Sequence, residues 1–458
     1  LMGVYLPRSL PILNLLFLFL SLTLIRYSYR IARRFFHRRT ASLRRTILIG
    51  AGAAGMMAAI CAARKGAKVL LLEKNSRPGR KIGITGKGRC NVTNADELPD
   101  FFKNIVSNPR FLYSALYGFT NRMLMDCLEE AGVPLKIERG NRVFPVSDSA
   151  RDIVDALTGM LKREKVRMVT GVTVLGLQPE EGRWKILTPF QEYEADRVIV
   201  ATGGQSYSKT GSTGDGYEMA RELGHHIQSI RPGLIALNTS DRYVPGLQGL
   251  SLKNVEVRIT QGDGKEVYQG FGEMLFTHFG VSGPLILSAS SLLQKYLSGK
   301  KKSWKEADFL LHIDLKPALN PDKLDSRVLR DLEQYRGRHM ENALQDLLPE
   351  RLITAVLEQS GIDALQRAGD LTRQQRMKLV ETLKDLRCHI TGTRPIEEAI
   401  VTMGGVDTRE LDPRTMQSRL HPGLYFAGEV VDVDALTGGY NLQIAFSTGA
   451  AAGSAAAE

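Results

Sequence analysis

The chain has 458 residues, of which 43% are hydrophobic, and a net charge of +12. This composition excludes a disordered or fibrous protein and predicts two or three globular domains with a large core. Residues 1–45 hold nine arginines and no acidic residue, so the remaining 413 residues carry only +3, and a general nucleic-acid-binding face is not supported. Cys61, Cys90, Cys127 and Cys388 show no CxxC or metal-type spacing, so we expect no metal site and a reducing compartment.

The N-terminal segment, residues 1–45, differs from the rest of the chain. It contains an apolar run, Leu10–Ile25, interrupted by Asn14, and eight arginines follow between Arg26 and Arg45. A signal peptide has the reverse order of charge and apolar residues. Two explanations remain open: a short membrane anchor whose arginines hold the protein on the cytoplasmic side, or an over-extended reading frame whose native start lies near residue 45. Both predict a cytoplasmic protein, with membrane contact restricted to residues 10–45.

Residues 46–55, TILIGAGAAG, place a short apolar strand directly before Gly50, Gly52 and Gly55, and a helical segment follows. The first glycine makes a tight turn, the second lets backbone N–H groups approach a pyrophosphate, and the third allows close helix packing. A second strand, residues 67–72, ends at Glu73, whose carboxylate can accept both hydroxyl groups of a ribose. Because that carboxylate repels a 2'-phosphate, the motif predicts FAD or NAD rather than NADP.

The C-terminal part of the chain distinguishes these two ligands. Residues 424–427, LYFA, are typical of a buried strand that ends at Gly428 and Glu429, and Gly438 and Gly439 open a helix of small residues. An extended FAD needs a late strand and helix that come back to the binding site. The N-terminus of that helix, at the pyrimidine edge of the flavin, stabilises negative charge on the reduced flavin ring. We therefore predict FAD. The alternative is that the two glycines merely cap a packed helix.

Between these ends, the pattern alternates strands and helices. Helical spacing covers residues 111–131 and 148–163, residues 77–94 read as a polar loop, and short strands are expected at 166–169, in a meander through Ile186, and at 196–201. From about Arg231, period-2 runs indicate a small antiparallel barrel, and residues 322–386 carry an apolar helical stripe. We therefore expect an N-terminal extension at residues 1–45 and an FAD-binding domain in two parts, residues 46–230 and 392–458. Between these parts we expect an inserted β-barrel at residues 231–318 and an inserted helical bundle at residues 319–391.

Four motifs make a specific resemblance visible: residues 79–94, 201–204, 210–216 and 428–443. In this order they resemble the bacterial BaiN-like flavoproteins, also called aminoacetone-oxidase-family FAD-binding enzymes. The resemblance covers residues 46–453. It implies an α/β fold, with a glutathione-reductase-like, doubly wound Rossmann-like domain that binds FAD and carries the inserted barrel and bundle. One departure is Ser208, where the family often has proline, and this change would loosen the loop beside the flavin.

The resemblance also implies the residues that contact a non-covalently bound FAD. They are Gly50, Gly52, Ala53, Ala54, Gly55, Glu73, Lys74, Arg80, Lys81, Thr85, Gly86, Gly88, Arg89, Cys90, Asn91, Ala201, Thr202, Gly203, Gly204, Gly428, Glu429, Gly439, Tyr440, Asn441, Leu442 and Gln443. Among these, Arg80, Lys81 and Arg89 offer cationic donors to a diphosphate.

Three residues could be mistaken for catalytic groups. Cys90 has no partner cysteine nearby, which favours a structural role. Tyr207 and His278 are candidates to face the substrate, although an isolated histidine is more often a hydrogen-bonded structural residue. The catalytic residues themselves cannot be named from the sequence.

The sequence thus predicts an FAD-dependent oxidoreductase in which hydride moves to or from flavin N5 and the protein sets geometry and electrostatics. No second dinucleotide fold is visible, because no strand precedes residues 211–216, so NAD(P)H is an open choice of electron donor. The resemblance implies reduction of an unsaturated steroid-like ketone or oxidation of a small amine. A flavin-dependent RNA-modifying protein is a rival that predicts a basic surface and an exposed cysteine. The charge of +3 disfavours it, so we expect a small-molecule substrate and no nucleic-acid partner. A membrane-anchored electron-transfer subunit, the second rival, rests on residues 10–45 alone.

Overall fold

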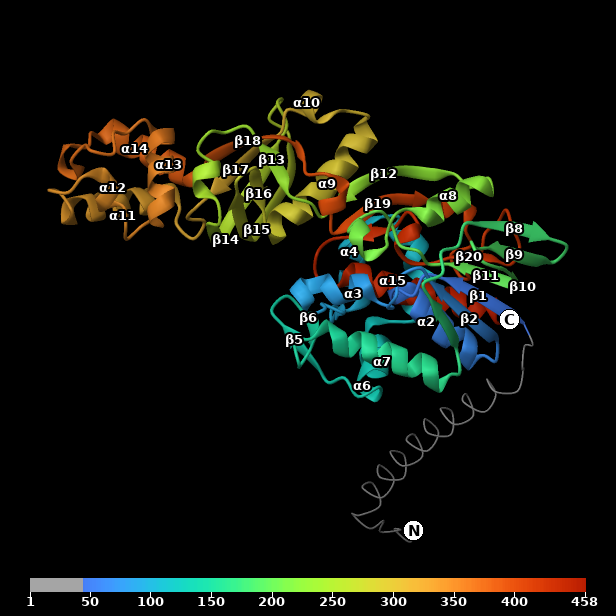
Figure 1. Ribbon diagram of the computed structural model, residues 1–458. Coiled ribbons are helices and arrows are strands. Elements are labelled where there is room, and N and C mark those ends of the chain that lie inside the picture. Colours follow the sequence, from blue (N-terminus) through green and yellow to red (C-terminus); the bar gives the residue numbers. More distant parts are fainter. Residues whose placement is uncertain (1–43) are drawn as a thin grey trace, which may run out of the picture.

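The computed structural model describes residues 44–458, and its centre is a five-stranded parallel sheet (Figure 1). The strands are, in spatial order, β20 (Leu424–Phe426), β11 (Arg197–Val200), β1 (Arg45–Ile49), β2 (Lys68–Glu73) and β7 (Arg167–Thr170). Their sequences are nearly continuous apolar runs, as a parallel sheet covered on both faces requires. The strands expected near 46–50, 67–72, 166–169, 196–201 and 424–427 are all confirmed.

Two apolar layers cover this sheet. On one face, Leu48, Leu71 and Ile199 pack with the helices α2 (Ala53–Arg64), α7 (Ala150–Arg163) and α15 (Tyr440–Ala456). On the other face, Ile47 and Val198 pack with side chains of an antiparallel meander. This meander consists of β8 (Gly176–Glu180), β9 (Arg183–Leu187) and β10 (Glu192–Ala195). Together the layers form the α/β, Rossmann-like fold that the sequence predicts.

The segment between β2 and α7 contains more regular structure than we expected. Residues 77–94 are not simply a loop, because they hold a short helix, a 3₁₀ turn at Thr85–Gly88 and a strand. Such short elements show no periodicity that a sequence pattern could reveal. The elements of this segment are α3 (Arg80–Ile84), β3 (Thr93–Asn94), α4 (Leu98–Lys103), β4 (Ile105–Ser107), α5 (Tyr113–Gly118), α6 (Asn121–Glu130), β5 (Leu135–Glu138) and β6 (Arg142–Pro145).

A closed six-stranded antiparallel barrel follows after α8 (Asp215–Glu222) and lies to one side of the sheet domain (Figure 1). Two connections join it to that domain, and they are preceded and followed by the paired strands β12 (Ile227–Gly233) and β19 (Val401–Val406). The barrel strands are β13 (Leu237–Thr239), β16 (Gly280–Ser282), β15 (Glu266–Thr277), β14 (Ser251–Thr260), β17 (Leu310–Asp314) and β18 (Leu386–Thr393). The helices α9 (Pro284–Lys300) and α10 (Trp304–Ala307) lie between β16 and β17.

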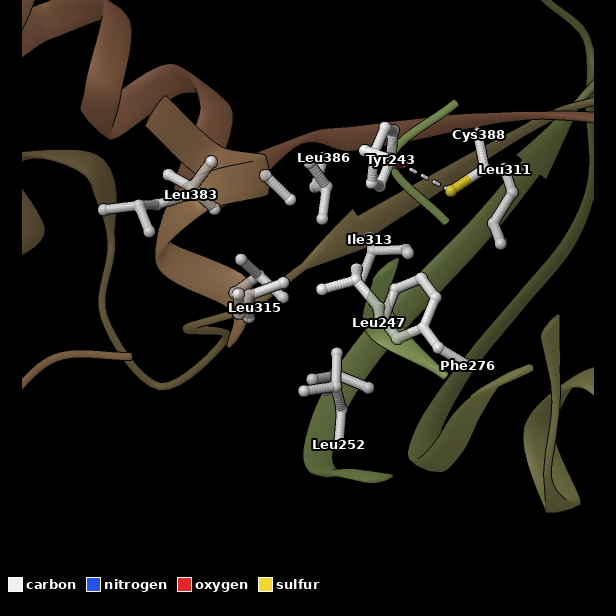
Figure 2. Close-up of a cluster of buried hydrophobic side chains, with 14 of the residues drawn as sticks. Tyr243, Leu247, Leu252, Phe276, Leu311, Ile313, Leu315, Leu383, Leu386 and Cys388 are labelled. Carbon is white, nitrogen blue, oxygen red and sulfur yellow. Dashed lines mark hydrogen bonds between the residues drawn. The ribbon is translucent and has the colours of Figure 1, made fainter. Parts of the chain in front are cut away.

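The barrel core is apolar apart from one polar contact (Figure 2). Phe276 and Ile313 are fully buried there. The Tyr243 hydroxyl donates to the Arg387 carbonyl at 2.6 Å, so the Cys388 thiol, 2.8 Å away, is left to donate to the Tyr243 oxygen. Burial raises the pKa of Cys388 to about 12, so this cysteine remains a neutral thiol with a structural role.

A helical bundle is inserted between β17 and β18. Its helices are α11 (Pro321–Gln334), α12 (Met340–Ala343), α13 (Glu350–Ser360) and α14 (Arg373–Lys384). Its apolar side chains and those of the barrel form one continuous core. The expected bundle boundaries, 319–391, need correction at their end, because residues 386–393 form β18 and close the barrel against β17 and β13. Within residues 44–458, no helix has the length and apolar character needed to cross a membrane.

Candidate functional site

A long cavity lies at the carboxyl ends of β1, β2, β11 and β20, where ligands bind in doubly wound folds. The N-termini of α2 and α15 both open onto it. Most of the predicted contact residues line this cavity, although they come from six separate stretches of sequence. They are Gly50, Gly52, Ala53, Ala54, Glu73, Lys74, Arg80, Lys81, Thr85, Gly86, Asn91, Ala201, Thr202, Gly203, Gly428, Glu429, Gly439, Asn441 and Leu442.

The fingerprint glycines are required by close backbone contacts. Gly50 has a φ of +100°, and a Cβ there would lie 2.5 Å from the carbonyl oxygen of Ala201. A Cβ on Gly55 would lie 1.8 Å from the carbonyl oxygen of Gly50, so this glycine permits the close packing of helix on strand. Gly52 instead faces open space in the cavity, which leaves room for a diphosphate at the N-terminus of α2.

Glu73 is held in place at the end of β2 by three donors. The Ala51 N–H donates to Oε2 at 2.6 Å, and the backbone and side-chain amides of Asn75 donate to Oε1 at 2.8 and 2.6 Å. The carboxylate is 6% exposed, so these bonds compensate for its burial. Beside it, the Lys74 ammonium pairs with Asp215 at 2.5 Å. This end of the cavity therefore has the acid expected at a ribose.

A second polar group lies between the diphosphate region and the far wall. The Lys81 ammonium donates to Glu429 Oε2 and to the Ser206 hydroxyl, both at 2.6 Å. The other oxygen of Glu429 accepts from Ser206 Oγ at 3.0 Å and from the Thr402 N–H at 2.7 Å. The pair joins α3 to the turn after β20, so two segments 348 residues apart meet at the cavity. Arg80 is exposed and donates instead to the side-chain oxygen of Asn75, the residue that also bonds Glu73, at 2.8 Å.

The N-terminus of α15 forms the third part of the site. Gly439 has a φ of +99°, and a Cβ there would lie 2.3 Å from the Thr93 carbonyl oxygen. The first N–H groups of a helix lack intrahelical acceptors, so this end presents free donors to the cavity. Two lining atoms, Asn91 Oδ1 and Thr202 Oγ1, are buried without a hydrogen-bond partner among residues 44–458. Unpaired polar atoms, open glycines and helix N-termini on one cavity fit an extended dinucleotide such as FAD.

Next to Gly438 the cavity wall becomes apolar. Leu436 and Thr437 precede the glycine, and Leu234 and Ile400 come from the two connections to the barrel. The Ile400 N–H donates to the Leu234 carbonyl at 3.3 Å, which holds the two connections together. Helix α9 of the barrel supports this wall: Ser291 Oγ accepts from the Leu234 N–H at 2.9 Å, and Ser288 lies 3.3 Å from the Thr437 hydroxyl. The inserted barrel therefore completes the site.

Seven predicted contact residues do not line the cavity. Arg89 is the largest correction, because its guanidinium pairs with Glu138 and Asp148 and stacks 4.2 Å above the Phe144 ring. It orders the loop rather than facing a diphosphate. The others are Gly55, Gly88, Cys90, Gly204, Tyr440 and Gln443, which are not among the residues that line the cavity.

These residues support the lining from behind. Cys90 is fully buried with its pKa raised to about 11 by that burial, so it is a neutral thiol. The Gln443 side chain accepts from Thr93 Oγ1 at 2.7 Å, and Tyr440 donates to Asp96 at 2.7 Å, so both fix the position of α15. They position the site without facing it.

Neither substrate candidate lines the cavity. Tyr207 is half-buried with a φ of +51° at the start of the turn Ser208–Thr210. His278 lies in the turn between β15 and β16, with its ring packed edge-on against Phe279 at 4.9 Å. Their assignment to the substrate remains a prediction without geometric support.

Sequence reasoning missed several lining residues. Val172 and Val174 follow β7, Thr210–Ser212 bracket the ribose end, and Leu234 and Ile400 border the inserted barrel. Val172, Val174, Leu234 and Ile400 carry no motif, and only the meeting of the two barrel connections brings Leu234 and Ile400 together. The motif at residues 210–216, seen in the sequence, was the available signal for Thr210–Ser212.

Comparison with known proteins identifies the family of the chain. The family described as "HI0933-like protein Rossmann domain" matches residues 44–455. The chain is 34% identical to the 3-dehydro-bile acid delta(4,6)-reductase of Clostridium scindens, over 90% of this chain and 98% of that protein. It is 33% identical to the ribosomal RNA dihydrouridine synthase of Escherichia coli, over 88% and 95% of the two chains, and 31% identical to the Haemophilus influenzae protein of the same name, over 88% and 96%.

Proposed function

Because the chain belongs to the HI0933-like flavoprotein family and is an FAD-dependent oxidoreductase, we propose that it reduces a carbon–carbon double bond conjugated to a ring carbonyl. Bound FAD supplies the hydride chemistry at N5. Two kinds of relative have names that describe such reductions, of a steroid nucleus and of a uracil ring. In both substrates the reacting group is a neutral, unsaturated ring carbonyl.

The observation that carries this proposal is the chemistry of the wall beside Gly438. Leu234, Ile400 and Leu436 offer apolar contact, and Thr437 offers a hydroxyl. Glu429 is the carboxylate whose hydrogen bonds come closest to this wall. Its negative charge is balanced by an ion pair with Lys81. A protonated amine would lose its hydration here without gaining a free carboxylate. A neutral ring carbonyl needs no carboxylate partner, so its burial costs less free energy. The wall therefore favours a conjugated ketone over an amine.

The chain's own residues perform binding and charge stabilisation. The N-terminus of α15 favours negative charge near Gly439, and the exposed Arg80 guanidinium, which has no ion-pair partner among residues 44–458, is a cation available to a diphosphate. Among the cavity-lining residues that the structure describes, the wall beside Gly438 has no titratable side chain, so the proton that follows hydride is delivered by a hydroxyl or by water.

An anaerobic half-reaction tests the proposal. The purified holoenzyme is photoreduced and mixed with a 3-oxo-Δ4,6-steroid, and the return of the oxidised flavin absorbance is followed by stopped flow. We expect the steroid to reoxidise the flavin, and aminoacetone to leave the oxidised enzyme unbleached. Bleaching of the oxidised enzyme by aminoacetone, with no reoxidation by the enone, would establish the amine oxidase instead.

A second candidate substrate is uridine within RNA. Two relatives that this chain matches over almost their full length carry that activity in their names. The expectation of no nucleic-acid partner rested on the low charge of residues 46–458, which disfavours broad electrostatic binding but not local stacking of bases. The same half-reaction with a uridine-containing oligonucleotide distinguishes the two substrates.

A further inference from the structure

Three aromatic side chains form a parallel cluster on the surface of α4 and α5. The ring centroids of Phe102 and Tyr113 lie 4.3 Å apart with an interplanar angle of 16°, and the Tyr117 ring is within 5° of the Tyr113 plane at 6.0 Å. Tyr113 is 49% exposed and Tyr117 is 55% exposed. We call Phe102, Tyr113 and Tyr117 the aromatic cluster. Large exposed aromatic surface of this kind marks an interaction site.

The geometry of the cluster differs from that of the buried rings. Phe101 and Tyr440 meet edge-on at 76°, and Trp304 and Phe309 at 73°. In the aromatic cluster the rings stack on one another, and Tyr113 and Tyr117 still remain about half exposed. Exposed aromatic rings are a feature by which proteins bind single-stranded nucleic acid, because every base can stack on them.

The cluster is connected to the wall of the cavity through α4. Phe101, the neighbour of Phe102, packs 4.8 Å from the ring of Tyr440 at the start of α15. Three residues after Phe101, the Asn104 carbonyl accepts from the N–H of Leu436, a cavity-lining residue, at 2.8 Å. One layer of protein thus separates the cluster from the apolar wall. A ligand that contacts both must be extended, as a strand of several nucleotides is.

Charges of both signs lie beside the cluster, and one cation among them is unpaired in the described part of the chain. Arg110 is exposed between α4 and α5 and has no ion-pair partner among residues 44–458. Lys103 is also exposed, and its contact with Asp100 at 2.7 Å is a surface ion pair, which is weak. Cations next to exposed rings allow one strand to place its bases on the rings and its phosphates on the side chains.

We propose that the aromatic cluster and Arg110 form a docking surface for single-stranded RNA, on which bases stack while a neighbouring uridine enters the cavity. This proposal rests on the second candidate function above.

Fluorescence anisotropy tests the docking surface without turnover. A fluorescein-labelled oligouridine of about twelve nucleotides, within the usual range of single-strand site sizes, is titrated with the oxidised, FAD-loaded protein. The double substitution Tyr113→Ala with Tyr117→Ala removes both exposed rings, and we expect it to weaken binding roughly tenfold or more. The double substitution to Phe keeps the rings, and we expect it to change the Kd by less than about twofold. FAD absorbance checks that each variant is folded.

Phe190, which is 90% exposed on the hairpin between β9 and β10, supplies the matched control. Its substitution Phe190→Ala should leave the Kd unchanged. Three outcomes would overturn the proposal: no oligouridine binding by the native protein, equal binding by the double Ala variant, or an equal loss from Phe190→Ala. A self-association on size-exclusion chromatography that the double Ala variant abolishes would also overturn it, since the cluster would then be a dimer contact.

The binding titration and the flavin half-reaction together test RNA docking and RNA reduction separately. RNA that binds through the cluster but does not reoxidise the photoreduced flavin leaves the surface in place and removes the uridine function. A steroid that reoxidises the flavin in a protein that does not bind the oligouridine does the reverse.

Discussion

At the scale of single residues, Asp434 has an unusual environment. It lies on β21 (Asp434–Ala435), is 1% exposed, and neither of its carboxylate oxygens has a hydrogen-bond partner among residues 44–458. Burial raises its pKa from 3.8 to about 6, and the neighbouring charge of Asp432 adds to the shift, while Ser107, Lys295 and Arg231 offset only part of it. The group lies between the sheet domain and α9 of the barrel, so its ionisation strains that contact.

This pKa predicts how stability changes with pH. The folded state binds the proton more tightly than the unfolded state, so ionisation destabilises the fold from about pH 4 upward and does so fully above pH 6. We expect Asp434→Asn to remove this penalty, with a gain on the order of 2–3 kcal/mol at pH 8 relative to pH 4. Urea unfolding at both pH values measures it. The exposed Asp100→Asn is the control, and an Asp434→Asn effect that is equal at both pH values would contradict the assignment.

Gly439 is the residue at which the backbone itself sets the geometry of the site. A side chain at this position meets the Thr93 carbonyl and requires a left-handed backbone. We expect Gly439→Val to lower FAD occupancy, or to slow flavin reduction on the order of a hundredfold, the scale of losing one preorganised donor. Stopped-flow reduction, normalised for bound FAD, measures both.

The control for this prediction is Cys90→Ser, because the Cys90 thiol is buried and neutral and faces no ligand. It should reduce at the native rate. Native behaviour of Gly439→Val would remove the N-terminus of α15 from the site, and an inactive Cys90→Ser protein with full FAD would indicate thiol chemistry.

At the scale of elements, the crossing of α15 over α2 is what brings the C-terminal motif to the fingerprint. A Cβ on Gly449 would lie 2.3 Å from the Ala54 carbonyl oxygen, and one on Gly453 would lie 2.1 Å from that of Ala58. Small residues therefore let the two helices approach until their backbones nearly touch. Both helices point their N-termini toward the cavity, so their separation determines its width.

We expect Gly453→Ala to destabilise the protein by about 1–3 kcal/mol, because the added methyl group must push the helices apart. The measurement is the urea midpoint of the holoenzyme together with its FAD content. Gly159→Ala is the matched control: it lies in α7, where a Cβ meets no atom within 4 Å, so the change should be neutral or stabilise the helix by up to about 1 kcal/mol. Equal effects of the two substitutions would show that the close crossing does not limit stability.

At the scale of the whole molecule, the described residues contain every element of the site. The first strand begins at Arg45, and the Arg44 carbonyl still accepts from the Lys68 N–H at 3.0 Å. The membrane anchor proposed from the sequence falls at residues 10–25, outside the described residues. The site can therefore be tested separately from that segment.

We predict that deletion of residues 1–43 leaves a folded protein that retains FAD, because β1 and its partners remain complete. The measurement is the ratio of flavin to protein absorbance after purification, with the melting temperature as a second readout. Aggregation or loss of FAD would show that the deleted segment packs against the fold. Membrane fractionation of the full-length chain then separates an anchor from an over-extended reading frame.

The sequence by itself determined the features that depend on neighbouring residues. Local backbone geometry or ligand contact requires particular residue types at the fingerprint glycines Gly50, Gly52 and Gly55, at Glu73, and at Gly438 and Gly439. Period-2 and helical spacing likewise predicted the barrel and the bundle. These patterns sufficed for the fold class and the cofactor.

The tertiary structure alone decided which of these residues face the cavity. Arg89 and Lys81 look equivalent in the sequence, yet Arg89 turns to Glu138 and Asp148 while Lys81 meets Glu429 from the other end of the chain. The apolar wall forms from two barrel connections, Leu234 and Ile400, that are 166 positions apart. Strand β18 follows the bundle in the sequence but pairs with β13 and β17, which precede the bundle, and so it belongs to the barrel. Each of these depends on contacts between distant segments, and no local pattern encodes such contacts.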